Sequence, residues 1–180
     1  MNGTKLSADF NFDYYGEFYM KIDNKKARII LAVIIAVSLV ISTVYMFAKQ
    51  GFHEDELLTY NLANSSKQLN VDGGWNSPED FNEYLAVSPD DRFDYAQVYE
   101  NQIIDASHPP LYYALVHTVC SFFPSVFSKW LAYSINVLAM AGILIMLYKI
   151  GRKITGNNLY ALIGVGAYAL SLSLIHISEP

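Results

Sequence analysis

An uncharged run of 19 residues near the start of the chain constrains the fold more than any other sequence feature. Residues 29–47, IILAVIIAVSLVISTVYMF, carry no acidic or basic side chain. As an α-helix rising about 1.5 Å per residue, this run would reach about 28 Å, close to the roughly 30 Å hydrocarbon core of a bilayer. The chain is also too apolar for an ordinary soluble domain, with 53% hydrophobic and 16% charged residues. We therefore predict a transmembrane helix at residues 29–48.

Two further apolar segments predict more membrane helices. Residues 129–150 contain the run WLAYSINVLAMAGILIMLYKI, which is long enough to cross a bilayer. After a predicted cytoplasmic turn at residues 151–157, the apolar residues 158–171 have the composition of the start of a third span. The predicted fold is an all-α polytopic membrane protein with about three transmembrane helices and a large first loop at residues 49–128.

Basic residues gather at two places and thereby indicate the orientation. One group precedes the first predicted span and the other follows the second; the groups are Lys21, Lys25, Lys26 and Arg28, and Lys149, Arg152 and Lys153. Because basic residues concentrate on the cytoplasmic side of a membrane, we expect a cytoplasmic leader at residues 1–28 and an extracytoplasmic loop at 49–128. Residues 49–110 carry 3 basic and 12 acidic residues, a formal charge of −9. This loop offers no basic groove, so nucleic acid is not an expected partner.

The loop ends with a proline-led apolar segment, DASHPPLYYALVHTVCSFFP, at residues 105–124. Its apolar part is too short to cross a bilayer, and crossing would reverse the orientation given by the basic residues. Proline is tolerated in the first turn of a helix, so we predict an interfacial helix at residues 111–123 that begins after Pro109 and Pro110. His108 would then lie at a helix N-terminus, where backbone N–H groups favour an anion such as phosphate. The alternative is a helix that only seals the outer rim of a membrane protein.

An acidic cluster, FHEDELLTY at residues 52–60, follows the first predicted span directly. Glu54, Asp55 and Glu56 place three carboxylates side by side near the membrane surface. Such a group is suited to acting as a base or to binding a cation. Acidic residues outside a membrane helix are also ordinary solvated ends, and that interpretation stays open. The orientation places this cluster and His108 at the same depth on the same side.

The order of these motifs resembles the C-type (GT-C) superfamily of polytopic membrane glycosyltransferases. The pieces are a hydrophobic helix, the pair Asp55-Glu56 at the start of a large loop, Asp105 followed by His108-Pro109-Pro110-Leu111, and Lys129 opening the next span. Within the superfamily the sequence is most similar to glycosyltransferase family 39, the protein O-mannosyltransferases and their bacterial relatives. The resemblance covers residues 29 to about 170. It implies an integral protein of the bacterial cell membrane.

The resemblance also implies a reaction and a set of site residues. The reaction moves a sugar from a polyprenyl-phosphate carrier to a hydroxyl of an extracytoplasmic acceptor, with inversion; the acceptor is a protein, a wall polymer or a lipid. Asp55 is the implied catalytic base, Glu56 assists acceptor or sugar binding, and Asp105 and His108 belong to the substrate-binding motif. Lys129 is the implied contact of the lipid phosphate. Relatives commonly have arginine at that position, and lysine lacks its bidentate geometry.

The resemblance implies no required cofactor, although a divalent cation at Asp55, Glu56 or Asp105 is an option in the wider superfamily. The four histidines show no metal-ligand spacing, so no zinc site is predicted. A second function class stays open, in which the chain is a non-catalytic membrane receptor, assembly or transport component with an acidic binding loop.

The last nine residues, LSLIHISEP at 172–180, match the in-frame translation of a transposase-based sequencing adapter. We therefore expect that the chain is the N-terminal fragment of a longer enzyme and that this fragment is inactive alone. The alternative is that these residues complete the third helix.

Overall fold

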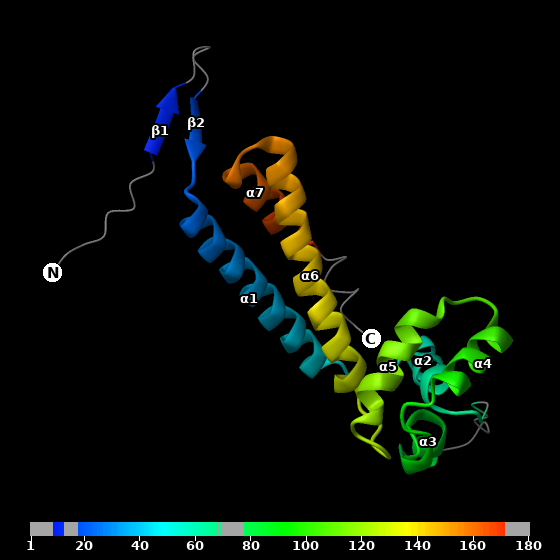
Figure 1. Cartoon of the computed structure of the whole chain (residues 1–180). Coiled ribbons are helices and arrows are strands. Elements are labelled where there is room, and N and C mark those ends of the chain that lie inside the picture. Colours follow the sequence, from blue (N-terminus) through cyan, green and yellow to red (C-terminus); the bar gives the residue numbers. More distant parts are fainter. Residues whose placement is uncertain (1–8, 13–17, 68, 70–77, 172–180) are drawn as a thin grey trace. The chain divides into compact units, whose positions relative to one another are not determined.

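The structure is a computed structural model that describes residues 9–12, 18–67, 69 and 78–171 (Figure 1). It is mostly helical, and the chain divides into two units, which are described separately. Unit 1 contains the chain up to Ala48 and from Val137 onward, and unit 2 spans Lys49–Asn136. Residues 172–180, which we interpret as an adapter translation, lie outside the described residues.

Unit 1 begins with a short hairpin in the predicted leader. Strands β1 (Asp9–Phe12) and β2 (Phe18–Lys21) pair antiparallel, with Asp9 opposite Lys21 and Phe12 opposite Phe18. The described part of the chain is thus mainly helical, as predicted, with one small two-stranded element at its start.

Helix α1 (Asn24–Ala48) contains the uncharged run and starts earlier than the predicted span. The Asp23 carboxylate caps it, because its Oδ1 accepts from the backbone N–H groups of Lys25 and Lys26, both at 2.9 Å. Such caps satisfy N–H groups that have no partner within the helix. Lys25, Lys26 and Arg28, which precede the uncharged run, are therefore helical, whereas Lys21 ends strand β2.

Helix α6 (Lys129–Thr155) starts at the residue where the sequence places its start, but it continues past residue 150. The predicted turn at residues 151–157 is too long, because α6 continues through the first five of these residues. Gly156 has φ +65°, the left-handed conformation that ends many helices at little cost for glycine, and its N–H donates to the Arg152 carbonyl at 2.9 Å. Asn157 then caps α7 (Asn158–Ala169), accepting from the Leu159 N–H at 2.8 Å. The turn is therefore confined to two residues.

Helices α1 and α6 are the two described helices that are long and apolar enough to cross a membrane. Only 22% of the apolar window of each helix is buried inside the protein. Exposed apolar surface of this extent is unfavourable in water and is typical of a helix that faces lipid. Helix α7 has 12 residues and would reach only about 18 Å, so the described residues do not confirm a third span.

The helices of unit 1 contact one another through stripes of residues spaced four apart. Their buried side chains form one hydrophobic cluster, which contains Ala27, Leu31, Met140, Leu144, Tyr148, Ala161, Leu162, Val165 and Ala169. A Cβ atom added to Gly151 would lie 3.4 Å from Ala161, so the backbones of α6 and α7 approach closely there. Small residues at such contacts are how membrane helices pack without a hydrophobic driving force.

Unit 2 contains the predicted loop at residues 49–128 together with the first turns of α6, and it has a core of its own. Its helices are α2 (Glu54–Asn64), α3 (Pro78–Leu85), the 3₁₀ helix η1 (Pro89–Asp91), α4 (Tyr95–Asp105), α5 (Pro110–Ser121) and the first turns of α6. The core brings together Tyr60, Ala63, Leu85, Val87, Val98, Tyr113, Val116, Cys120 and Ala132. Tyr60 connects α2 to α6, because its hydroxyl donates to the Ser128 carbonyl at 2.7 Å and accepts from the Ala132 N–H at 2.9 Å.

Helix α5 is the helix predicted at residues 111–123, and its first helical residue is Pro110. It packs against α2 and α4, with Val116 and His117 fully buried. Burial disfavours the charged imidazole and so lowers the pKa of His117. Leu111, Leu115 and Phe122 on α5 and at its end remain exposed. The segment is therefore a packed helix of unit 2 that also presents an apolar row to its surroundings.

Candidate functional site

Asp55 lies in the first turn of α2, where a capping box fixes the helix start. The His53 side chain accepts from the backbone N–H of Asp55 at 3.3 Å, and the Glu56 carboxylate accepts from the His53 N–H at 3.2 Å. These reciprocal bonds satisfy N–H groups that the helix leaves unpaired. The Asp55 side chain is 85% exposed, with Oδ2 at 3.4 Å from His53 Nδ1. Its carboxylate therefore faces outward from a fixed backbone.

Asp105 and His108 are held together by a turn between α4 and α5. Asp105 ends α4, and Ala106 adopts the left-handed conformation at φ 54°. The Asp105 carboxylate then accepts from the backbone N–H groups of Ser107 and His108, both at 3.2 Å, and contacts His108 Nδ1 at 2.8 Å. The imidazole contact, followed by these N–H groups, lowers the pKa of Asp105. The spacing of three residues therefore lets a local turn join the two side chains by a hydrogen bond.

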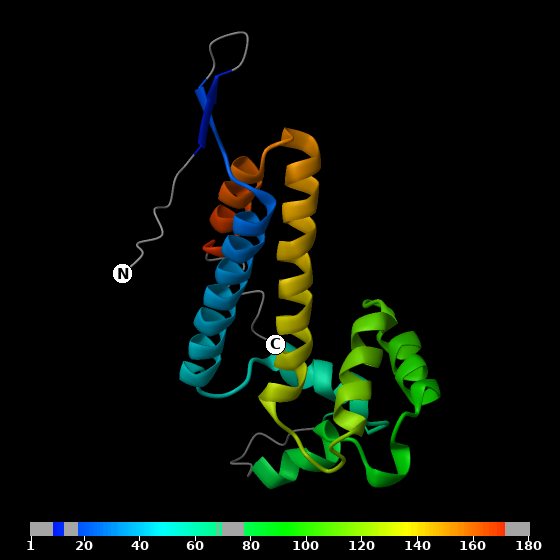
Figure 2. The same ribbon diagram turned by 60° about the vertical axis from the view of Figure 1, so that its left-hand side comes forward.

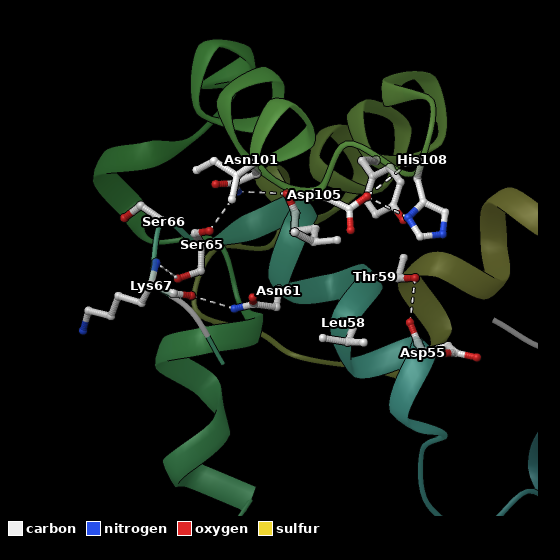
Figure 3. A pocket seen from close by; sticks show the side chains of 13 residues that line it. Asp55, Leu58, Thr59, Asn61, Ser65, Ser66, Lys67, Asn101, Asp105 and His108 are labelled. Atoms are coloured by element: carbon white, nitrogen blue, oxygen red, sulfur yellow. Dashed lines mark hydrogen bonds and ion pairs between the residues drawn. The ribbon is translucent and has the colours of Figure 1, made fainter. Parts of the chain in front are cut away.

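A pocket of about 410 Å³ brings this pair together with Asp55 (Figure 3). The three residues come from α2, α4 and the turn before α5, so the fold assembles what the sequence separates by 50 residues. Asp55, Thr59 and His108 lie toward one end of the pocket in this view, and Ser66 and Lys67 lie toward the other. Of the five predicted site residues, Asp55, Asp105 and His108 line this pocket.

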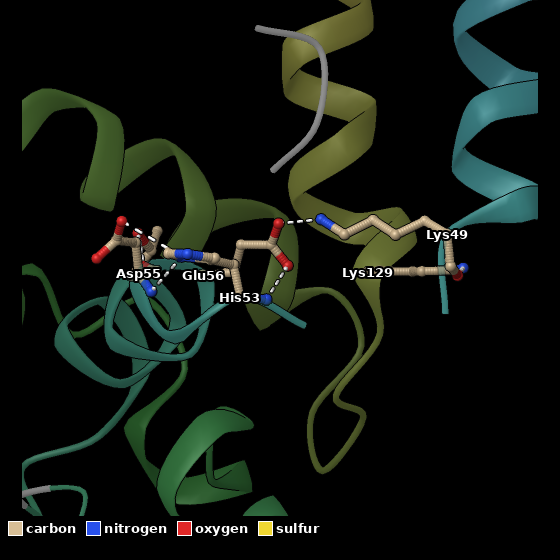
Figure 4. A network of polar contacts seen from close by, with 6 residues as sticks. Lys49, His53, Asp55, Glu56 and Lys129 are labelled. Carbon is tan, nitrogen blue, oxygen red and sulfur yellow. Dashed lines mark hydrogen bonds and ion pairs between the residues drawn. The ribbon is translucent and has the colours of Figure 1, made fainter. Parts of the chain in front are cut away.

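Glu56 and Lys129 are not among the residues that line the pocket. The Glu56 side chain is 7% exposed and forms an ion pair with Lys49, whose side chain is 17% exposed. Lys129 Nζ donates to the Lys49 carbonyl at 2.8 Å. Figure 4 shows that the carboxylates of Asp55 and Glu56 point in opposite directions. Adjacent acids therefore have different surroundings, one facing the pocket and the other the Lys49 ammonium.

The pocket also contains residues that sequence reasoning missed. They are Leu58, Thr59, Asn61, Leu62, Ser65, Ser66, Lys67, Asn101, Ile104 and Tyr113. A signal existed for some of them, because positions three, four and seven residues after Asp55 share its helix face. Leu58, Thr59 and Leu62 occupy those positions. Asn101 precedes Asp105 by four residues and so lies on its helix face, whereas Ile104 directly precedes Asp105. Only tertiary structure brings α4 to α2.

Two amide side chains stabilise the wall of the pocket. Asn101 Nδ2 donates to the carbonyls of Leu62 and Ser65, both at 2.9 Å, and so connects α4 to the end of α2. Asn61 Nδ2 donates to the Lys67 carbonyl at 2.8 Å and to the Tyr84 carbonyl at 2.9 Å. These contacts pair backbone groups at helix ends, which otherwise lack partners. The segment at residues 65–67 is thereby fixed on its inner side.

The lining is suited to a ligand that carries many hydroxyl groups. Two carboxylates accept hydrogen bonds, several hydroxyl and amide groups can donate or accept, and one imidazole adds a ring nitrogen. Leu58, Leu62 and Ile104 provide an aliphatic surface. The volume lies within the range of small-molecule sites. The described residues contain no group of three or more His, Cys, Asp or Glu side chains that could hold a metal ion. A divalent cation remains only an option implied by the resemblance.

Comparison with protein-family models, curated proteins and solved structures finds no match for this chain. The family resemblance therefore depends on the motifs at Asp55-Glu56, Asp105, His108-Pro109-Pro110 and Lys129. The chemistry of the pocket is the independent basis for a functional argument.

Proposed function

We propose that this chain belongs to an inverting membrane glycosyltransferase that uses a polyprenyl-phosphate sugar as donor. The single observation that carries the proposal is the pocket lined by Asp55, Asp105 and His108. The sequence motifs predict each of these residues as part of a site, and they line one pocket although 50 residues separate the first from the second. Their assembly beside hydroxyl and amide groups supports a site that handles a polyhydroxylated substrate.

In the proposed reaction, the oxygen of the acceptor hydroxyl attacks the anomeric carbon of the sugar, and Asp55 accepts the proton of that hydroxyl. The new glycosidic bond forms on the face opposite the departing group, the bond to the phosphate oxygen breaks, and polyprenyl phosphate leaves. An exposed carboxylate suits this role because it is free to approach an acceptor that arrives from solvent. The acceptor stays open between a protein, a wall polymer and a lipid.

Asp105 and His108 would position the sugar. The Nδ1 contact with Asp105 orients the His108 ring and leaves Nε2 as the ring nitrogen for a ligand. Lys129 is retained as the proposed contact of the lipid phosphate, on the resemblance alone. Its ammonium donates to the Lys49 carbonyl, and Lys129 does not line the pocket.

The proposed location is a bacterial cell membrane, with residues 49–128 outside and the leader in the cytoplasm. Both α1 and α6 have lipid-facing composition, and Lys49 directly follows α1. A polyprenyl tail stays in the bilayer, so its sugar is reachable only close to the membrane surface. A loop joined to two apolar helices satisfies that condition.

The test is a transfer assay with the full-length protein in membranes that contain polyprenyl-phosphate hexoses, mannose first. We expect protein-dependent release of polyprenyl phosphate and loss of the lipid-linked sugar. If the lipid-linked sugar binds but is never consumed with any hexose or acceptor offered, the receptor or transport alternative replaces this proposal.

A further inference from the structure

A concentration of basic side chains at one end of unit 1 has no part in the proposed reaction. Three cations belong to the start of α1 and three to the end of α6; they are Lys25, Lys26, Arg28, Lys149, Arg152 and Lys153. All six side chains are exposed. We call this group the basic end.

A polar contact joins the two halves of the basic end. Asn158, the first residue of α7, donates from Nδ2 to the Ile22 carbonyl at 2.7 Å and to Asn24 Oδ1 at 3.1 Å. Its Oδ1 accepts from the Tyr148 hydroxyl at 2.9 Å. One side chain thus connects the start of α1, the last turns of α6 and the start of α7, and Figures 1 and 2 show these ends side by side. The two basic groups therefore belong to helix ends that meet at Asn158.

Among the described residues, few ion pairs compensate the charge of the basic end. Asp23 is the carboxylate that meets it, and Asp23 pairs with Lys26 at 3.6 Å. For Lys25, Arg28, Lys149, Arg152 and Lys153, the described part of the chain shows no ion pair. Helices α1 and α7 also begin here, and helix N-termini bear a partial positive charge. The last turn of α6 contributes the opposite partial charge, which its own Arg152 and Lys153 offset.

Apolar side chains adjoin the cations. Ile29 follows Arg28 and is 57% exposed, Ile150 follows Lys149 and is 50% exposed, and Ile154 follows Lys153 and is 79% exposed. A ligand at this end would therefore meet positive charge and hydrocarbon surface together. Long basic side chains extend toward phosphate groups while their stems cover apolar surface.

We propose that the basic end is a binding site for an anionic phospholipid, with the phosphate on the cations and the acyl chains along α1 and α6. Clusters of four to eight basic residues beside a membrane helix are the charge pattern that attracts anionic lipids. The shared contacts of Asn158 distinguish a built site from scattered charges, because they fix the two basic groups relative to each other. The inference is independent of sugar transfer and requires only that unit 1 lies in a membrane.

The test measures lipid binding to the full chain in a zwitterionic detergent, by native mass spectrometry. The probes are dioleoyl phosphatidylglycerol and, for the neutral comparison, dioleoyl phosphatidylcholine. We expect the phosphatidylglycerol to bind preferentially and the triple variant Lys149→Gln, Arg152→Gln and Lys153→Gln to bind it at least about tenfold more weakly. The pair Lys25→Gln and Arg28→Gln should weaken the same binding. Equal binding of both lipids, or unchanged binding in both variants, overturns the proposal.

Two further measurements separate a built lipid site from simple charge attraction and from a site for free phosphate. Asn158→Leu retains every charge but removes the contacts that join the helices, so binding should weaken although the net charge is unchanged. If this variant binds phosphatidylglycerol as tightly as the unaltered protein does, charge attraction alone explains the binding and the basic end is not a built site. Soluble glycerol phosphate and inorganic phosphate should not displace the lipid at equal concentration. Full displacement by either would instead assign the site to a free phosphate compound. Circular dichroism checks that each variant remains helical.

Discussion

Replacing Asp55 by asparagine should lower the rate of sugar transfer by about 10²- to 10⁴-fold, the range that general acid–base catalysis contributes. Asparagine has nearly the same shape but cannot accept the acceptor proton. The Asp55 side chain is 85% exposed, and the bonds that hold the helix start use its backbone atoms. The variant should therefore fold and insert as the unaltered protein does. The measurement is the initial rate of polyprenyl phosphate release in membranes with matched protein amounts.

Glu54→Gln is the matched control for this experiment. Glu54 is the neighbouring acid on the same helix turn, it is exposed, and it does not line the pocket. Its neutralisation removes the same charge at the same depth, so the rate should change little. Transfer that survives in Asp55→Asn, or falls equally in Glu54→Gln, would show that Asp55 is not the base.

Glu56→Ala should lower the free energy of unfolding by about 3 kcal/mol, because it leaves the Lys49 ammonium without its partner in a mostly buried place. The two side chains are 7% and 17% exposed. The substitution also removes one half of the capping box of α2. Chemical denaturation followed by circular dichroism, in detergent, provides the measurement. The expected effect is a loss of stability with loss of activity as its consequence.

Glu83→Ala is the comparison that tests burial as the cause. Glu83 pairs with Lys67 at 2.8 Å, but these side chains are 54% and 59% exposed. An exposed pair contributes at most about 1 kcal/mol, so this variant should unfold almost as the unaltered protein does. A stable Glu56→Ala variant that only binds substrate poorly would instead support the substrate-binding role that the resemblance implies for Glu56.

Much of the helical structure could be predicted because its causes are local. The uncharged run at residues 29–47 predicts α1, and the two prolines at 109 and 110 predict where α5 starts. The predicted end of α6 is too early, because basic residues mark the edge of the apolar run and not the edge of the helix. Basic residues are good helix formers in a last turn, and the helix ends only where Gly156 adopts a positive φ.

The candidate site was predictable only in part for a related reason. The contact between Asp105 and His108 follows from their spacing of three residues, which a local turn can close. The approach of Asp55 to that turn, and the contribution of Asn101 and Lys67 to the pocket, depend on how α2 and α4 pack. Neighbouring acids at 55 and 56 look alike in sequence, yet helix geometry directs them to different sides.

Membrane sidedness of the pocket is the most direct test of the central claim, that Asp55 and His108 share one site at the outer membrane surface. Cys120 is the only cysteine of the chain and is fully buried, so a Cys120→Ala background permits single-cysteine labelling. In intact spheroplasts, a membrane-impermeant maleimide should label Asp55→Cys and His108→Cys, but Lys25→Cys and Arg152→Cys only after permeabilisation. Labelling of positions 55 and 108 from opposite sides, or of both only after permeabilisation, would contradict the account.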